Sequence, residues 1–451
     1  MRKTLLAATA LLGVSFGMAQ AADLSIASTT PAGLTGYVSP VVAATPGHIV
    51  VHLGFRQNVY FEGMWNGNNG SAVGGGLAST QPGGNKTQPQ ALTGYSRIFG
   101  GFDGETTQGL KYGAVMEIRE NNFAGPTYGS GSAVFSSSFS SAESFSNTLF
   151  VRRGYIYIGT DQIGMLRAGE VDGPMSLFLA GTFDNLGTGG WNGDLVAYSS
   201  TYPIWAWADV GNSYTTAKLE YLSPELYGFQ FAISYEPNAA PLQDNYFQCS
   251  TGNCFDTSTS TTPSELTRRR NTIEVGLRYI GTLFNTVDVN TSLTGEFAGR
   301  VLGAAGTSLL GVTKYQDQRV GDFGIKLTYA GITVGGNIQG GSVNGQWANL
   351  PSGGHDQLAY QVGVSYEIGG LLAGASYFSN YYQGMPGLHA RRDQGVTVAA
   401  NWTFAPGAQA IVEYDYGWRH QSGFDFFNGS PGTANNDVKE QIIGAGFQFA
   451  F

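Results

Sequence analysis

The sequence predicts an all-β fold, a closed antiparallel 16-stranded transmembrane β-barrel. Three observations predict it: an unusual composition, an alternation of apolar and polar residues, and a regular succession of long and short connections. Only 12% of the 451 residues are charged, while aromatic residues make up 13% and glycine contributes 67 residues. An ordinary soluble domain has about 25% charged residues. Acidic residues outnumber basic ones, 32 to 23, so the basic footprint of a nucleic-acid-binding protein is absent and no nucleic-acid partner is expected.

The first 21 residues have the pattern of a secretory signal peptide. Arg2 and Lys3 precede an apolar run that starts at Leu5, and the small-residue site Ala19-Gln20-Ala21 follows. Cleavage after Ala21 makes the formal net charge of -9 more negative by two. Later in the chain no apolar run approaches the roughly 20 residues of a membrane helix. We therefore expect residues 22–46 to form an N-terminal periplasmic segment and residues 47–451 to form the barrel.

Period-two alternation marks the strands. From Leu358 to Ile368 the even positions are apolar, and the odd positions are polar or small. Successive side chains of a strand point to opposite faces, so this pattern gives one apolar and one polar face. The same split, with charges in the middle of strands, predicts sixteen strands at residues 47–57, 91–103, 108–122, 146–159, 162–171, 213–223, 227–237, 268–281, 284–301, 316–330, 331–342, 356–369, 370–381, 391–405, 407–420 and 438–451.

The connections between these strands alternate strictly between short and long. Short turns include Ala330-Gly331, whereas 58–90, 123–145 and 238–267 are long and rich in Gly, Ser and Asn. Outer-membrane barrels have an even number of strands, short periplasmic turns and long external loops. Tyrosines and tryptophans near strand ends, among them Tyr60 and Trp418, suit the interfacial girdles of such a barrel.

Three segments resemble those of a known family. The last strand ends in an apolar row with Phe447, Phe449 and Phe451, the hairpin Leu219–Phe231 contains Tyr-x-Ser-Pro-x-x-x-Gly-Phe, and Arg153–Glu170 forms a further hairpin. They resemble the sixteen-stranded trimeric general porins of Gram-negative outer membranes. The resemblance implies a homotrimer in lipid and lipopolysaccharide that passes small hydrophilic solutes and ions by passive diffusion, without a cofactor. It also implies that the terminal phenylalanines form the signal for the barrel-assembly machinery.

The third long connection, 171–212, is expected to carry the function. It contains four aspartates and no Lys or Arg, together with Trp191, Trp205 and Trp207. In the family that the chain resembles, this loop folds into the barrel and places acidic groups opposite a basic wall; opposed charges across a narrow pore filter solutes by charge. The resemblance therefore implies an acidic loop of Asp172, Asp184, Asp194 and Asp209. It also implies a basic wall of Arg56, Arg97, Lys111, Arg119, Arg152, Arg153 and Arg167. The aromatics either anchor the loop or stack on sugars.

Other chemistry has weaker support in the sequence. Cys249 and Cys254 flank four residues of one long loop, and in an oxidising exterior they form either a disulfide or two free thiols. No metal site is predicted. A substrate-selective channel, for example for carbohydrates, stays open as an alternative. A barrel enzyme needs a Ser–His or Asp–His constellation near a rim, and no local motif supplies one, so the chain is not expected to be an enzyme.

Overall fold

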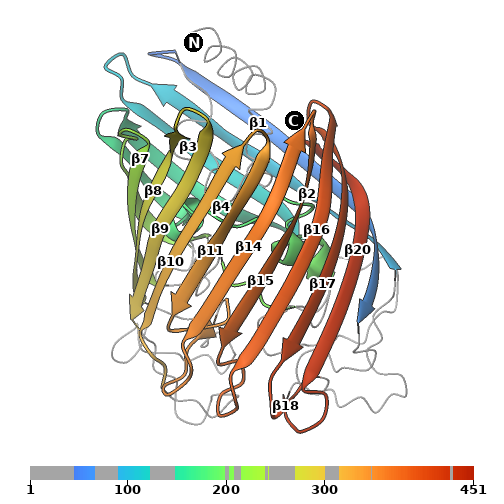
Figure 1. Ribbon diagram of the computed structural model, residues 1–451. Helices are drawn as coiled ribbons and strands as arrows, with labels where there is room; N and C mark the ends of the chain where they lie inside the picture. Colours follow the sequence, from blue (N-terminus) through green and yellow to red (C-terminus); the bar gives the residue numbers. More distant parts are fainter. Residues whose placement is uncertain are drawn as a thin grey trace.

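The computed structural model describes residues 45–66, 90–121, 148–198, 203–207, 215–238, 242, 270–299, 314–346, 348–426 and 430–450. Sixteen long strands follow one another around one sheet in chain order, and the sheet closes on itself (Figure 1). These strands are β1 (Ile49–Asn66), β2 (Gln90–Glu105), β3 (Lys111–Asn121), β4 (Thr148–Thr160), β5 (Gly164–Asp172), β6 (Thr215–Leu222), β7 (Phe229–Asn238), β8 (Arg270–Leu283), β9 (Val287–Gly299), β10 (Gln318–Tyr329), β11 (Ile332–Gly341), β14 (Gln357–Ile368), β15 (Leu371–Tyr382), β16 (Arg391–Ala405), β17 (Ala408–His420) and β20 (Asp437–Ala450).

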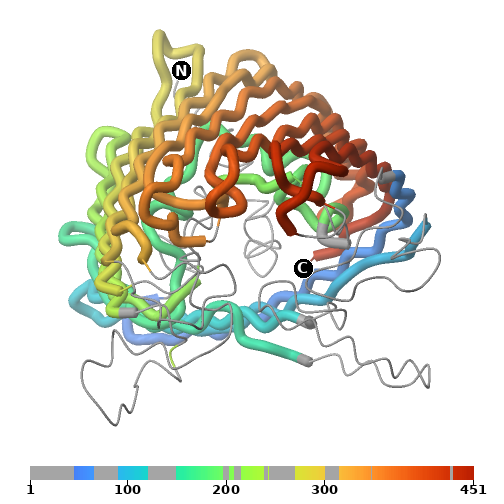
Figure 2. The backbone as a smooth tube through the Cα atoms, turned by 90° about the horizontal axis from the view of Figure 1, so that it is seen from below, coloured from blue at the N-terminus to red at the C-terminus, as the bar shows by residue number. Residues whose placement is uncertain are grey.

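The first and last strands close the barrel. Tyr60 of β1 pairs with Thr93 of β2 on one side and with Gly446 of β20 on the other. Every other pair along the sheet is also antiparallel and joins strands that follow one another around the barrel, and a view along the barrel shows the closed ring (Figure 2). Closure leaves no sheet edge with unpaired backbone groups. The predicted fold class, a closed antiparallel barrel of sixteen strands, is confirmed.

Burial in this barrel is inverted relative to a soluble protein. Large apolar side chains are exposed on the outside, for example Leu53 at 66% and Leu293 at 58%. Charged side chains such as Glu117 and Arg167 are each 1% exposed. Because every strand alternates between these two faces, the polar row points to the interior. An apolar outer surface of this extent is stable only against an apolar solvent such as membrane lipid.

Most predicted strand limits agree with the structure within three residues, and β1 is the exception. It was predicted to end at residue 57 but continues to Asn66. The alternation persists beyond that point, since Val59 and Phe61 are exposed whereas Tyr60 and Glu62 are buried. The prediction that Tyr60 lies in an interfacial girdle was therefore wrong: its side chain is 1% exposed and belongs to the inward row.

The connections follow the predicted rhythm. Short ones have two to six residues, as at Ala330-Gly331, and they alternate with connections of eight residues or more. Two of the long connections contain small hairpins, β12 (Val343–Asn344) with β13 (Ala348–Asn349) and β18 (Phe424–Asp425) with β19 (Ser430–Pro431). In the described ranges, no helix has the length and apolar character needed to cross a membrane.

Candidate functional site

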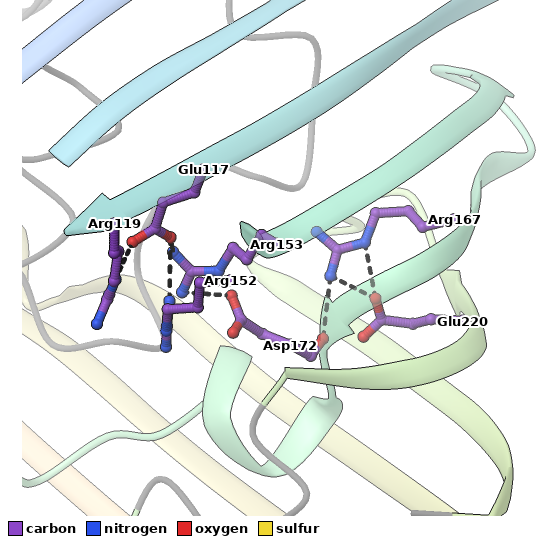
Figure 3. Close-up of polar contacts among 7 residues, drawn as sticks. All are labelled: Glu117, Arg119, Arg152, Arg153, Arg167, Asp172 and Glu220. Atoms are coloured by element: carbon purple, nitrogen blue, oxygen red, sulfur yellow. Dashed lines mark hydrogen bonds and ion pairs between the residues drawn. The ribbon is translucent and has the colours of Figure 1, made fainter. Parts of the chain in front are cut away.

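A buried carboxylate on β3 gathers three arginines. Glu117 accepts hydrogen bonds from Arg152 Nη1 at 3.1 Å and Arg153 Nη1 at 2.7 Å, and it also pairs with Arg119 (Figure 3). The register explains why two consecutive residues reach one group. Glu117 faces Arg153 but the next residue faces Val151, so Arg152 is the extra residue of a β-bulge. A regular strand would have turned one of these two arginines outward.

The same network continues to the end of β5. Arg153 Nη2 lies 2.7 Å from Asp172 Oδ2, which places the first predicted acidic residue against the basic wall. Arg167 donates from Nε to Glu220 at 2.7 Å and from Nη2 to the carbonyl oxygen of Asp172 at 3.2 Å. These contacts fix the point where the chain leaves the sheet (Figure 3).

A second arginine group lies on β1 and β2. The guanidinium carbons of Arg56 and Arg97 lie 5.3 Å and 4.2 Å from the ring centroid of Tyr95, a cation–π arrangement. Arg97 Nη2 is 3.9 Å from Asp194 Oδ1, and Asn58 Nδ2 donates to Asp194 Oδ2 at 3.3 Å. The Arg97 and Asp194 side chains stay 14% and 26% exposed. Another predicted acid–base pair is thus brought together.

The segment after β5 starts against the polar row of β8. Its first turn is the helix α2 (Pro174–Leu177), whose Met175 N–H donates to Glu274 Oε2 at 3.1 Å. The other oxygen, Glu274 Oε1, accepts from Lys218 Nζ at 2.8 Å. A Cβ on Gly173 would lie 2.1 Å from Glu274 Oε1, so any larger residue here would have to displace this carboxylate. Further on, the Ala180 N–H donates to Ser292 Oγ of β9 at 3.2 Å.

The same segment then contacts the polar rows of β16 and β17 through the turn η2 (Gly190–Asn192) and the residues before it, and the turn η3 (Leu195–Tyr198) contacts β20. The Gly187 N–H donates to Asn401 Oδ1 at 2.7 Å, and Asn401 Nδ2 donates back to the Gly187 carbonyl at 2.9 Å. Thr188 Oγ1 donates to Glu413 Oε1 at 3.1 Å. Side chains on two sides of the barrel therefore hold one segment by its backbone.

The tryptophans of this segment are buried. Trp191 Nε1 donates to the Val396 carbonyl at 3.2 Å, and Trp205 and Trp207 pack edge to face with ring centroids 5.2 Å apart. Trp207 in turn packs on Phe378 of β15 at 6.2 Å. Each of the three is at most 3% exposed. Their contacts are those of anchors, and these rings offer no free face for a sugar to stack on.

The remaining predicted residues lie elsewhere. Lys111 Nζ pairs with Asp161 Oδ1 at 2.6 Å at the turn between β4 and β5, apart from the other basic residues. Asp184 is half-buried and accepts from Thr182 Oγ1 at 3.1 Å. Phe447 and Phe449 point outward and pack on Phe404, with centroids 6.4 Å and 6.5 Å away. Asp209, Cys249, Cys254 and Phe451 lie outside the described residues, as do the predicted signal peptide and most of the segment 22–46.

The sequence reasoning missed two residues that hold these arginine groups together. Glu117 connects three arginines, and Tyr95 lies between two, yet neither was among the candidate site residues. Each precedes a predicted wall arginine by two positions, Glu117 before Arg119 and Tyr95 before Arg97. Residues two apart in a strand share a face, so this spacing was the signal that could have found them.

Comparisons with known proteins agree with this architecture. A family model described as Gram-negative porin matches residues 7–419. The anion-selective porin from Comamonas acidovorans superposes with a TM-score of 0.54 at 12% identity, over 90% of this chain and 100% of that one. The outer membrane channel DcaP of Acinetobacter baumannii superposes with a TM-score of 0.50 at 13% identity, over 91% and 100%. No curated protein matches in sequence.

The structural likeness, at these identities, is a likeness of fold. The family match covers most of the chain and agrees with an apolar exterior, a charged interior and sixteen closed strands. The chain belongs to the Gram-negative porin family and forms an outer-membrane channel for passive diffusion.

Proposed function

We propose that the predicted constriction loop, residues 171–212, narrows a general diffusion channel that passes small hydrophilic solutes and ions, with its described parts 173–198 and 203–207 against the wall. The observation that carries the proposal is the approach of Asp194 in this segment to Arg97 of the wall, 3.9 Å apart with both side chains accessible to water. The hydrogen bonds to Glu274, Asn401 and Glu413 support a loop that stays in one position.

The accessible charges of this region set the expected selectivity. Arg97 and Arg119 keep 14% and 23% of their side chains exposed on the wall. Asp194 keeps 26% exposed and Asp184 is half-buried in the loop. Because Arg97 and Asp194 are 3.9 Å apart, ions pass beside this pair and not between its members, and both charges act on them. Two positive and two negative groups nearly balance in charge, so we expect the channel to discriminate only weakly between cations and anions.

Reversal potentials in a KCl gradient test this proposal. A unit charge about 5 Å from a passing ion in a water-like medium changes the ion's energy by about 0.8 kcal/mol, about fourfold in local concentration. Arg97→Ala should therefore shift the permeability ratio several-fold toward cations, and Asp194→Asn should shift it toward anions. Lys111→Ala, at the far turn, is the matched control. Equal ratios in all three variants would contradict a constriction at this place.

A carbohydrate-selective channel is the nearest alternative. It needs accessible aromatic rings along the passage, whereas Trp191, Trp205 and Trp207 are buried. Liposome swelling separates the two functions. A general channel gives rates that fall smoothly with solute size, and a selective one saturates for its own sugar.

We also propose that the chain has no hydrolase activity. One group of side chains, which includes His420, allows this proposal to be tested. His420 Nδ1 lies 2.7 Å from Asp437 Oδ1, and its Nε2 lies 3.2 Å from Ser422 Oγ, the connectivity of a catalytic triad. The His420 and Asp437 side chains are 48% and 73% exposed, so water competes for these contacts. If the purified channel hydrolyses phospholipids or esters and Ser422→Ala abolishes this activity, the chain is an enzyme and the proposal is wrong. The absence of hydrolysis supports the proposal.

The assembly proposals follow from the family. We propose a homotrimer surrounded by outer-membrane lipid and lipopolysaccharide, with the signal peptide 1–21 removed on export. The outward rings of Phe447 and Phe449 support an exposed terminal motif for the barrel-assembly machinery. Phe447→Ala should lower the amount of folded protein in the membrane, measured as the fraction that migrates as folded barrel in unheated gels.

A further inference from the structure

The outer surface of the barrel is hollowed across β8, β9 and β10. The hollow measures about 480 Å³ and is lined mainly by apolar groups, among them Phe231, Val275 and Leu293. The backbone beneath the hollow consists of residues that pair with one another across neighbouring strands. Val275 pairs with Gly295, Gly295 with Gly321, Gly321 with Gly340, and Gly340 with Leu358. Three neighbouring strands thus place glycine at one level of the outer face, and we call this row the glycine trough.

The fold does not require these glycines. The φ angles of Gly295, Gly321 and Gly340 lie outside the left-handed region. A Cβ on Gly321 would meet no heavy atom within 4 Å, and the nearest atoms for the other two are 3.4 Å away. Glycine inside a strand weakens the strand, and it often marks a place where a ligand approaches the backbone closely. The three glycines therefore leave space at the outer surface that a group from outside the chain can fill.

Apolar ridges border the trough. On the side of the short turns, five large side chains stand in register, each between 38% and 58% exposed: Leu277, Leu293, Phe323, Ile338 and Tyr360. On the side of the long connections, Ile273 and Phe297 are followed by Arg319. The trough therefore has an apolar wall along its length and a cation on one border.

The dimensions of the trough fit one acyl chain. From Val275 to Leu358 it crosses four strand spacings of about 4.8 Å, about 19 Å in all. Strands tilted by about 45° make this row span about 13 Å of membrane depth, close to the half-thickness of a hydrocarbon core of about 30 Å. The row also approaches the long connections, because Gly321 is three residues from the start of β10 and Gly340 is one residue from the end of β11.

Arg319 supplies a cation on the long-connection border of the trough, beside Gly321. Its side chain is 73% exposed, on the long-connection side of the trough, and Asp317 lies 3.9 Å from its Nη2. Guanidinium groups bind phosphate oxygens in a bidentate manner. We propose that the glycine trough binds one acyl chain of a phosphate-bearing membrane lipid whose phosphate pairs with Arg319.

Native mass spectrometry of the purified channel tests the proposal. The protein is loaded with dipalmitoyl phosphatidylglycerol or with dipalmitoyl phosphatidylcholine. Gly321→Leu places a large side chain in the trough. It should abolish the tight binding of both lipids at this site. Arg319→Ala should lower the amount of bound phosphatidylglycerol about fivefold. It should also reduce the ratio of bound phosphatidylglycerol to bound phosphatidylcholine. Pore conductance should not change in either variant.

Two matched controls sit on the same outer face. Ala375, in register with Val364 and Val398, receives the same new side chain in Ala375→Leu. Lys439→Ala removes another exposed cation, on β20. Both controls should retain the wild-type amount of lipid. Lipid binding in the two trough variants equal to that of the controls would overturn the proposal. Loss of the oligomer in Gly321→Leu with lipid binding unchanged would overturn it in favour of a subunit contact.

Discussion

Replacing Glu117 by glutamine tests the buried charge network most sharply. The side chain is 1% exposed and accepts from Arg152 Nη1 at 3.1 Å and Arg153 Nη1 at 2.7 Å, in addition to Arg119. Glutamine keeps the shape of the side chain but removes its charge. The three guanidinium groups then face one another without the carboxylate between them.

The structure sets the size of the expected loss. Removal of one partner from a buried ion pair costs about 3–5 kcal/mol. Arg153 keeps Asp172 Oδ2 at 2.7 Å, which retains part of the stabilisation, so Glu117→Gln should lose about 3 kcal/mol of unfolding free energy. Urea unfolding in lipid vesicles, followed by the gel shift of the folded barrel, measures this loss. Glu367→Gln, at an exposed position of β14, should change stability by no more than about 0.5 kcal/mol.

A double variant separates the network from a general loss of packing. Glu117→Gln combined with Arg152→Ala also removes one of the three cations that contact Glu117, so the double variant should lose less stability than the sum of the two single changes. Additive losses, or a Glu117→Gln variant as stable as the Glu367→Gln control, would refute the reasoning that this carboxylate offsets the arginines.

Three further predictions concern the loop and the wall. Asn401→Ala removes both hydrogen bonds to Gly187, so it should cost about 1–3 kcal/mol and increase open-channel current noise in planar bilayers; unchanged noise would contradict an anchoring role. Gly187→Ala should disturb the same contact more strongly, because φ is +62° and a Cβ would lie 1.8 Å from Glu413 Oε2; single-channel conductance should become heterogeneous. Lys111→Ala should leave conductance unchanged and cost no more than about 1 kcal/mol in urea unfolding, since its partner Asp161 is 70% exposed.

The barrel could be predicted from the sequence because its stability depends on a pattern that the sequence displays directly. Lipid outside and water inside force period two on each strand, and the alternation of connection lengths gives the order of the strands. The end of β1 was missed because the polar sequence after residue 57 was interpreted as a loop, although Val59 and Phe61 continue the outward row.

The candidate site could be predicted only in part. Strand phase places Arg97 among the candidates, the acidic loop that the resemblance implies places Asp172 there, and the structure gives both an oppositely charged neighbour. The bulge that turns Arg152 and Arg153 to the same carboxylate depends on the register between β3 and β4, which no local pattern encodes. Lys111 shares the inward phase but lies at another height, because phase fixes the face of a strand and not the depth within the barrel.

The most direct test of the central proposal places a thiol at the proposed constriction. Asp194→Cys is made in a background with Cys249→Ser and Cys254→Ser, and a bulky charged thiol reagent is added during single-channel recording. A passage bordered by Asp194 and Arg97 predicts a stepwise fall in conductance in the variant and no step in the background channel. Complete labelling of the thiol, verified by mass spectrometry, with conductance unchanged would contradict a constriction formed by this loop.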